Sequence, residues 1–271
     1  MRKGIVLAAV VFILVGTPAA VLAASESNDA NQPVKKQQVA KTAELIGWWK
    51  FDEPNGNIAK DSSGNGFNAT VQLGRGPKIW GPGEGFDSNG CAKFTGQQLV
   101  MIPNAVWGRV KEQLSISFWV NQDAKNPPGE SWPGPWGCAP TAGLNFGDPG
   151  WLPLRAFVPT PNKTIDIGKD EEHVFWEASD ANAYAGSWNH YVFVKDVNEQ
   201  TLRLYYNGTQ VAEVFGATEP MPKVNNFIVG GRMYPTADWF GKIDDLRIYN
   251  TALSQAEAQK LFESKPAKTE K

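Results

Sequence analysis

The sequence is poor in the residues on which many hydrolytic sites depend. It has only two histidines, His173 and His190, and no G-x-S-x-G, metal-protease or phosphate-loop motif. The common enzyme classes that use these motifs are therefore excluded. His190 lies in an apolar, strand-like segment and is interpreted as structural. His173 follows three acidic residues and could act as a base or a metal ligand, but an exposed loop histidine is the simpler interpretation.

The chain has no excess of positive charge. It contains 26 Lys and Arg against 28 Asp and Glu, which gives a formal charge of −2. Loss of Arg2 and Lys3 with an N-terminal leader would remove two more positive charges. Binding to a nucleic-acid backbone requires a basic face, so a nucleic-acid partner is excluded.

Only residues 4–22 form a long apolar run. A basic start before the run and small residues after it are typical of a secretory signal peptide, here over residues 1–23. A membrane anchor is the alternative, but Pro18 and the small-residue exit favour cleavage. No cysteine follows the run to carry a lipid, and no other segment is apolar enough to span a membrane. We expect an exported protein that is periplasmic, secreted or on the cell surface.

The rest of the chain predicts a single folded unit. Residues 24–43 are polar and are interpreted as a flexible linker, and residues 264–271 as a disordered basic tail. The intervening residues 44–263 are enough for one large β-sandwich.

Two cysteines, Cys91 and Cys138, are present. An even number of cysteines in an exported chain favours a disulfide. In the chain-entropy estimate, a disulfide that closes a loop of this length stabilises the fold by roughly 4 kcal/mol. The alternative is two separate buried thiols.

Alternating apolar residues predict many short strands. The clearest strand places Leu114, Ile116, Phe118 and Val120 on one face. Residues 188–194 are apolar on both faces, which is typical of a central strand. The pair Asn207-Gly208 predicts a tight hairpin. One helix is expected after Ser254, which forms a capping box with Glu257.

The last predicted strand, residues 239–249, carries an unusual charge. Asp244 alternates with Leu246 and Ile248, so the three side chains should share one face. A charge on an apolar face is costly unless it is paired or bound to a metal. We therefore expect Asp244 to anchor a cation inside the sandwich, while Asp245 points to the other face and pairs with Arg247 or Arg232.

Six motifs occur in order along the chain. They are IGWWKFDE at 46–53, DSSGNG at 61–66, SISFWV at 115–120, WNHYV at 188–192, LYYNG at 204–208 and GKIDDLRIY at 241–249. Together they resemble the laminin-G-like, concanavalin A-like jelly-roll domains of secreted bacterial proteins. The resemblance implies an all-β fold, a jelly-roll sandwich of two antiparallel sheets with one short C-terminal helix.

The resemblance also implies one structural calcium ion. Its expected ligands are Asp52, Asp61, Gly64, Asn65 and Asp244, because Ca²⁺ prefers carboxylate and carbonyl oxygens. The alternative for Asp61 is that its side chain only caps the turn that follows it.

Catalysis is not favoured by the carboxylate pattern. The laminarinase-like relatives of this fold carry Glu-x-Asp-x-Glu or Glu-x-Asp-x-x-Glu on one strand, and retaining glycosidases need two close carboxylates. No Glu here has an Asp two residues later. A lyase-type site remains an alternative, because its residues need no fixed spacing.

A long Pro- and Gly-rich segment, residues 122–186, is the best candidate for recognition. Exposed indoles can stack on sugars. The candidate ligand-binding residues are Trp132, Trp136, Trp151 and Arg155 of this segment, together with Trp239 near the last predicted strand. Packing under the loop is the alternative for the tryptophans of the segment and the preferred interpretation for Trp176, whereas packing at a hinge is the alternative for Trp239. We predict a non-catalytic module that binds a glycan or an envelope or matrix partner. The alternatives are a glycan-degrading hydrolase or lyase with its site in 122–186, and a purely structural envelope protein.

Overall fold

The computed structural model describes residues 43–74, 78–95, 98–125, 155–157, 164–169, 172–178, 186–221, 227–230 and 240–264. The chain divides into two units, Met1–Ala40 and Lys41–Lys271. All described residues belong to the second unit, and the predicted signal peptide lies outside them, as does nearly all of the predicted linker and tail.

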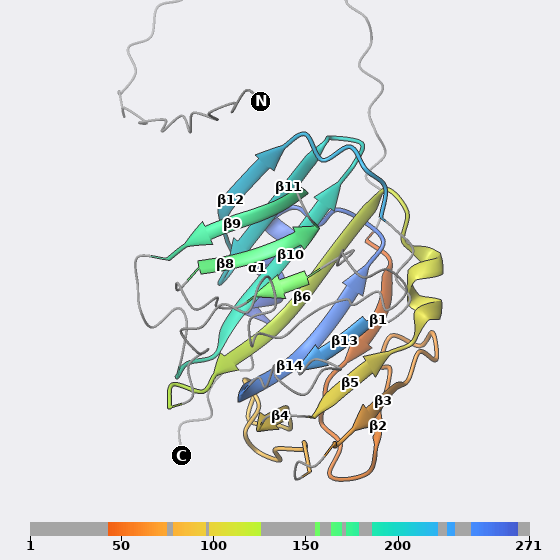
Figure 1. Cartoon of the computed structure of the whole chain (residues 1–271), viewed down its shortest axis with the longest axis vertical. Helices are drawn as coiled ribbons and strands as arrows, with labels where there is room; N and C mark the ends of the chain where they lie inside the picture. The colour runs from red at the N-terminus through yellow and green to blue at the C-terminus, as the bar shows by residue number, and fades with distance from the viewer. Residues whose placement is uncertain are drawn as a thin grey trace, which may run out of the picture. The chain divides into compact units, whose positions relative to one another are not determined.

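One layer of the fold is a seven-stranded antiparallel sheet (Figure 1). Its strand order is β1-β14-β6-β10-β11-β12, with β4 also paired to β14. The strands are β1 (Leu45–Trp49), β4 (Ala92–Thr95), β6 (Gln113–Gln122), β10 (Asn189–Asp196), β11 (Thr201–Tyr206), β12 (Thr209–Phe215) and β14 (Phe240–Tyr249).

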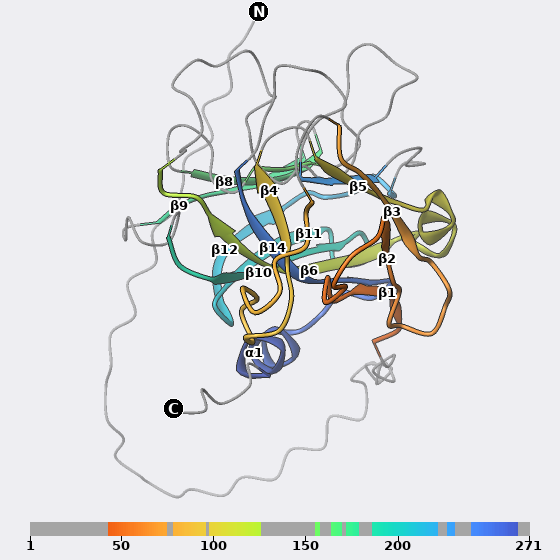
Figure 2. The same cartoon turned by 90° about the horizontal axis from the view of Figure 1, so that it is seen from below.

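Two smaller sheets lie on one side of this layer (Figure 2). One has the order β13-β5-β3-β2, with strands Phe227–Gly230, Leu99–Ile102, Ala69–Gln72 and Ile58–Ala59. The other has the order β7-β8-β9, with strands Arg155–Phe157, Thr164–Lys169 and Glu172–Glu177. The expected sandwich of antiparallel sheets is confirmed, and the segment predicted to be a long loop contributes strands to its second layer. A short 3₁₀ helix, η1 (Asn104–Arg109), follows β5.

The core lies between the layers and follows the predicted alternation. Leu114, Ile116, Phe118 and Val120 of β6 are all part of the main buried cluster, as expected from their spacing. Val174 of β9 belongs to the same cluster, so the three-stranded sheet packs on the same inner face. Strand β10 is buried throughout and lies between β6 and β11, which confirms the predicted central strand.

The outer face of the large sheet is covered by helix α1 (Gln255–Glu263) (Figure 2). A second buried cluster includes Val192 and Val194 of β10 and Ala258 of α1. The predicted capping box is present: the Ser254 side chain accepts a hydrogen bond from the Glu257 backbone, and the Glu257 carboxylate accepts one from the Ser254 backbone.

Local turn chemistry accounts for the β11–β12 hairpin. Asn207 and Gly208 have φ angles of 47° and 80°, the left-handed values that the predicted hairpin turn requires.

Strand β1 pairs with β14, and the Asn250 backbone donates to the Glu44 carbonyl. The first and last of the described strands therefore lie side by side.

Candidate functional site

A β-bulge interrupts β14 at its two adjacent aspartates. The register with β6 shifts between Asp244 and Arg247, and Asp245 has a left-handed φ of 50°. Asp244 lies opposite Trp119 and Arg247 opposite Ser117, both on the face of β6 that does not belong to the main core. One extra residue in a strand reverses the side-chain alternation beyond it.

The predicted common face of Asp244, Leu246 and Ile248 is therefore wrong. Leu246 and Ile248 belong to the main core cluster, whereas Asp244 faces the opposite side of the sheet. Asp245 lines the same pocket as Asp244, so the prediction of opposite faces for these two residues is also wrong.

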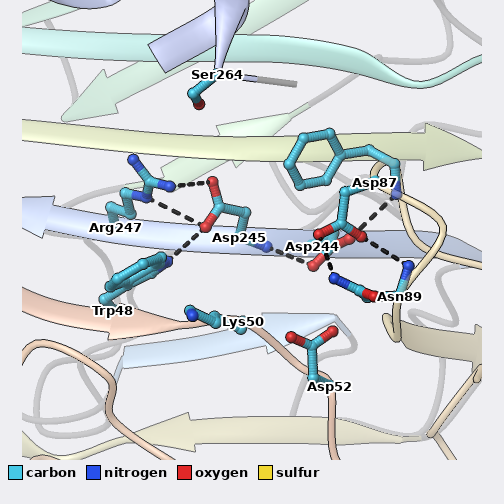
Figure 3. Close-up of a pocket in the computed structure, with 10 residues that line it drawn as sticks. Trp48, Lys50, Asp52, Asp87, Asn89, Asp244, Asp245, Arg247 and Ser264 are labelled. Atoms are coloured by element: carbon cyan, nitrogen blue, oxygen red, sulfur yellow. Dashed lines mark hydrogen bonds and ion pairs between the residues drawn. The ribbon is translucent and has the colours of Figure 1, made fainter. Parts of the chain in front are cut away.

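A pocket on this outer face gathers four aspartates (Figure 3). Its cavity of about 170 Å³ is bordered by the end of β1, loop 81–91, β14 and the residue that follows α1. The aspartates are Asp52, Asp87, Asp244 and Asp245. Pockets for drug-sized ligands occupy about 300–1,000 Å³, so this cavity suits a hydrated ion better than an oligosaccharide.

The charge of Asp245 is compensated within the pocket. Arg247 forms an ion pair with it at 2.9 Å, and the Trp48 indole N–H donates to it (Figure 3). The predicted pairing with Arg247 is confirmed, and Arg232 lies outside the described residues. Lys50 and Arg247 also lie over the Trp48 ring, at 4.3 and 4.6 Å from its centroid. The ring therefore already packs against two cations.

Asp244 has no such partner in the described part of the chain. Its side chain is buried, and its oxygens accept hydrogen bonds from the backbone N–H groups of Phe86 (3.1 Å) and Asp245 (2.8 Å). Burial raises the pKa of Asp244 to about 9, and the charges of Asp87 and Asp245 add to the rise. A carboxylate in this environment must be protonated or must be matched by a cation.

The remaining acids border the same space. Asp52 accepts a hydrogen bond from the Gly90 backbone at 2.8 Å, and its pKa is raised by burial and by the charges of Asp87 and Asp245. Asp87 accepts from both the backbone and the side chain of Asn89, each at 2.8 Å. The pocket therefore presents several carboxylate and amide oxygen atoms, which are the ligands that hard cations prefer.

Two glycines allow the backbone to approach this pocket closely. A Cβ atom on Gly85 would lie 2.2 Å from the Gly90 carbonyl oxygen and 2.6 Å from an Asp244 oxygen. A Cβ atom on Gly90 would lie 2.7 Å from the Phe51 carbonyl oxygen. Loop 81–91 and the end of β1 thus bring carbonyl oxygens near the aspartates, at a distance that only glycine permits.

Backbone strain is concentrated around the same pocket. Phe51 (φ 56°), Ser88 (φ 71°) and Asp245 (φ 50°) all adopt the left-handed region, and each lies in or next to a pocket-lining residue. Such conformations cost free energy in non-glycine residues and often occur at functional sites.

The pocket offers oxygen atoms of the kind that Ca²⁺ prefers, but its acids do not form a ready metal site. Among the described residues, no group of three or more His, Cys, Asp or Glu side chains is arranged to hold a metal ion. An ion would therefore need amide and backbone oxygens to complete its coordination, as Ca²⁺ sites commonly do. Asn89 is the pocket-lining residue that offers an amide oxygen, and the Phe51 and Gly90 carbonyls lie in the adjoining backbone.

The structure separates the predicted calcium ligands into two groups. Asp52 and Asp244 line the pocket, whereas Asp61, Gly64 and Asn65 do not. Asp61 instead accepts hydrogen bonds from the backbones of Trp48 (3.0 Å), Ser63 (2.8 Å) and Phe67 (2.9 Å). Burial pushes the pKa of Asp61 upward, but the hydrogen bonds from Ser63, Phe67 and Trp48 leave it below its ordinary value.

Asn65 is likewise occupied within its loop. Its side chain donates to the Leu45 and Ile46 carbonyls and accepts from Arg109 at 2.6 Å. These contacts are those of a loop that fastens the start of β1, which is the alternative interpretation of Asp61. Sequence reasoning missed Asp87 and Asn89, although the Asp, Asn and Gly of residues 87–90 are a visible turn signal.

Most of the residues predicted to bind a ligand cannot be placed, whereas Trp176 can. Trp132, Trp136, Trp151 and Trp239 lie outside the described residues, and of Arg155 only the backbone, in β7, is described. Trp176 packs against the core with its ring centroid 4.9 Å from that of Tyr206, which agrees with the packing interpretation.

The two histidines lie on different strands. His190 is buried and hydrogen-bonded to Ser117 at 2.9 Å, which agrees with a structural role. His173 is half-buried in β9 rather than in a loop.

The predicted disulfide is not formed in this structure. Cys91 is a buried free thiol that donates to the Gly81 carbonyl at 3.7 Å, and Cys138 lies outside the described residues. Burial raises the pKa of Cys91 to about 12, so the thiolate needed for disulfide exchange is scarce. Within the described ranges, no helix has the length and apolar character needed to cross a membrane.

Family comparison identifies the class of fold. The family model described as the concanavalin A-like lectin/glucanases superfamily, Laminin_G_3, matches residues 94–259. The chain belongs to this superfamily, which confirms the predicted resemblance and the jelly-roll sandwich. No curated protein matches the chain by sequence.

Solved structures share the fold at low sequence identity. Domain 4 of AbnA, a GH43 extracellular arabinanase from Geobacillus stearothermophilus, in complex with arabinotriose, is 21% identical with a TM-score of 0.57, over 81% of this chain and 98% of that one. Trypanosoma rangeli sialidase in complex with the inhibitor DANA is 17% identical with a TM-score of 0.56, over 82% of this chain and 33% of that one. The receptor binding domain of botulinum neurotoxin C/D mosaic serotype is 15% identical with a TM-score of 0.56, over 81% of this chain and 51% of that one. These identities establish the fold alone.

Proposed function

We propose that the protein is an exported, non-catalytic laminin-G-like module that binds a glycan, or an envelope or matrix partner, and that carries a structural Ca²⁺ ion. One observation carries the recognition role. The chain aligns with 98% of a single domain of a larger enzyme, and that domain was solved with a bound oligosaccharide. A match to one sugar-bound domain over nearly its full length supports binding, although the superfamily contains both lectins and glucanases.

The state of the pocket carboxylates supports a non-catalytic role. Asp245 is paired with Arg247, Asp244 is buried under two backbone donors, and Asp87 is held by Asn89. Glycoside hydrolysis needs one carboxylic acid and one carboxylate facing a sugar. The cavity of about 170 Å³ is smaller than usual pockets for drug-sized ligands.

The proposed Ca²⁺ ion would be held by Asp52, Asp87, Asn89 and Asp244. When bound, it would supply the positive charge that the buried Asp244 lacks among the described residues, and it would join β1, loop 81–91 and β14. This set keeps two of the ligands predicted from the sequence and replaces Asp61, Gly64 and Asn65 by residues of the neighbouring loop. Support comes from the oxygen-rich lining and from the two glycines that bring carbonyl groups close.

The glycan surface is proposed to be the segment that contains Trp132, Trp136 and Trp151. A screen of the purified protein against a glycan array identifies ligands, and calorimetry then measures their affinity. The triple variant W132A/W136A/W151A should lose at least tenfold in affinity, because stacked aromatic contacts dominate small recognition sites. Phe215→Ala is the matched control, since Phe215 is 74% exposed on β12 and lies outside that segment.

Three results would change the proposal. Unaltered affinity in the triple variant would reject that surface. Capture of an envelope or matrix protein without any glycan binding would select the protein-partner form of the proposal. Release of reducing sugar or of unsaturated products from a polysaccharide panel would overturn the non-catalytic assignment in favour of a hydrolase or lyase.

A further inference from the structure

The residues that β9 buries define the outer face of the three-stranded sheet β7-β8-β9. Val174 is fully buried in the main core, and Trp176 packs against that core from the same face of the strand. Phe175 lies between them in sequence and is 55% exposed. Because successive strand residues alternate between faces, Phe175 marks the face of this sheet that is turned away from the core. Figure 2 shows β8 and β9 on the opposite side of the large sheet from α1.

The strand register extends this outer face across all three strands. Asp166 of β8 pairs with Phe175 of β9 on one side and with Phe157 of β7 on the other. Directly paired residues of an antiparallel sheet share a face. The positions of Phe157, Asp166 and Phe175 therefore form one row, called here the aromatic row, whose ends are two strand spacings or roughly 9–10 Å apart. Ile165, next to Asp166 in sequence, is fully buried in the core, as this alternation requires.

A second row lies beside the aromatic row on the same face. Gly168 of β8 pairs with Arg155 on one side and with His173 on the other. Gly168 has no side chain, so this row is lowest at its middle strand. A glycine inside a strand is typical of places where a ligand approaches the backbone closely.

The residue types in these two rows are suited to a sugar. Phenylalanine rings, as at the two ends of the aromatic row, pack against the apolar C–H faces of sugar rings. The carboxylate of Asp166 accepts hydrogen bonds from hydroxyl groups, and the guanidinium of Arg155 donates to them. A few polar groups among apolar ones are the usual composition of a small-ligand site.

The charge of the face favours one kind of glycan. Its positions carry two acids, Asp166 and Glu177, against one cation, Arg155, with His173 neutral. An excess of negative charge disfavours a ligand with carboxylate groups of its own. The hydroxyl groups of a neutral sugar can pair with both the acids and the arginine.

We infer that the outer face of the sheet β7-β8-β9 binds a neutral glycan. One sugar unit packs on the aromatic row, and its hydroxyl groups donate to Asp166 and accept from Arg155. The inference rests on the proposed glycan-binding function and adds a surface and a ligand class to it. Of the residues in the two rows, only Arg155 was among the ligand-binding residues predicted from the sequence.

The test begins with the ligand class. The purified wild type is screened on an array of neutral and acidic glycans. Calorimetry then measures its affinity for arabinotriose, laminaritriose and any neutral oligosaccharide selected on the array, and for trigalacturonic acid as the acidic probe. At least one neutral oligosaccharide should bind about tenfold or more tightly than the acidic probe. Amide chemical shifts should change on binding within residues 164–168 and 173–177.

Substitutions on the face test its residues. Phe175→Ala should weaken binding of the neutral oligosaccharide by about fivefold or more, because it removes an exposed ring. Phe175→Tyr keeps the ring and should keep the affinity. Asp166→Asn keeps the size of the side chain and should also lose about fivefold or more. Phe215→Ala, which removes an exposed phenylalanine from β12, is the matched control and should bind as the wild type does.

The outcomes separate this inference from the function on which it rests. Neutral-glycan binding that neither Phe175→Ala nor Asp166→Asn weakens would overturn this surface and leave the proposed function in place. Tighter binding of trigalacturonic acid than of every neutral oligosaccharide would overturn the ligand class. Absence of binding to any glycan on the array would overturn this inference together with the glycan form of the proposed function, and would leave its protein-partner form.

Discussion

Asp244 and Leu246 are two residues apart on one strand, yet their side chains lie on opposite faces of the sheet. Leu246 is in the main core, and Asp244 faces a pocket with three other aspartates. The bulge at Asp245 causes the reversal and brings two adjacent acids into one site. Both the cation proposal and its tests depend on this relationship.

Removing the Asp244 charge should abolish the response to calcium. If Ca²⁺ occupies the proposed site in the folded state alone, it should raise the melting temperature of the wild type, and EDTA should lower it. Asp244→Asn should show no calcium response and should be at least as stable as the wild type in EDTA, because a buried uncompensated charge is costly. Thermal unfolding in both buffers measures this.

Glu112→Gln, an acid-to-amide change at an exposed position, is the control for Asp244→Asn. This variant should keep the full difference in melting temperature between the calcium and EDTA buffers. Equal melting temperatures of the wild type with calcium and with EDTA would remove the ion from the proposal.

Asp61→Ala should destabilise the protein equally with and without calcium. Its carboxylate accepts three backbone hydrogen bonds that fasten β1. Loss of such an acceptor leaves buried donors unsatisfied and costs about 1–3 kcal/mol. Denaturant unfolding in both buffers gives the two values, and a larger loss in calcium would return Asp61 to the ligand set.

Gly85→Ala should disrupt the pocket. The added methyl group would lie 2.2 Å from the Gly90 carbonyl and 2.6 Å from Asp244, so loop 81–91 must move. Overpacking of this kind costs about 1–3 kcal/mol, and calcium affinity should fall as well. Gly108→Ala is the matched control, because no atom lies within 4 Å of its added Cβ. A fully stable Gly85→Ala variant with normal calcium affinity would contradict the described approach of the loop to β14.

Acid should destabilise the protein through His190. Burial, with a smaller contribution from Arg247, lowers the pKa of His190 from 6.5 to about 3. Between these values the unfolded chain binds a proton that the folded chain does not, so stability falls as the pH drops through this range. His190→Gln should reduce the slope by up to one proton, about 1.4 kcal/mol per pH unit.

Denaturant unfolding of both proteins from pH 7.5 to 4 measures the difference between the slopes. Parallel curves for the wild type and His190→Gln would show that folding does not lower the pKa of His190.

The stability of the contact between the three-stranded sheet β7-β8-β9 and the large sheet should depend on one buried ion pair. Lys195 of β10 binds Glu172 of β9, and their side chains are only 4% and 16% exposed. Glu172 also accepts from the backbones of Thr218 and Glu219. Lys195→Met leaves the carboxylate without its cation and should cost about 3–5 kcal/mol. The double variant Lys195→Met/Glu172→Gln should recover part of the loss, and additive losses would show that the two residues do not interact.

Much of the fold could be predicted because its signals are local. The alternation in residues 114–120, the Asn207-Gly208 turn and the Ser254 capping box each depend on a few neighbouring residues, and all three are confirmed. Of the two partners predicted for Asp245, Arg247 and Arg232, the one two residues away forms the ion pair.

The candidate site was less predictable because its residues come from distant segments. Phe86 and Asp244 are 158 residues apart in sequence, and nothing near Asp87 or Asn89 indicates that they meet β14. A one-residue bulge leaves no signal in an apolar pattern, so the face of Asp244 was wrongly predicted. Asp61 was a plausible ligand because a turn rich in Asp, Asn and Gly can bind either a cation or its own backbone.

The adjacency of β1 and β14 has a consequence for how such a unit can be combined with others. Trp48, near the start of the fold, and Ser264, just after α1, border the same pocket, so entry and exit of the polypeptide are at one end of the unit. A unit of this geometry can be inserted into a surface loop of a host protein with short connections on both sides. The same arrangement makes it a favourable scaffold for circular permutation, with new ends placed at the exposed residues 198–200 between β10 and β11.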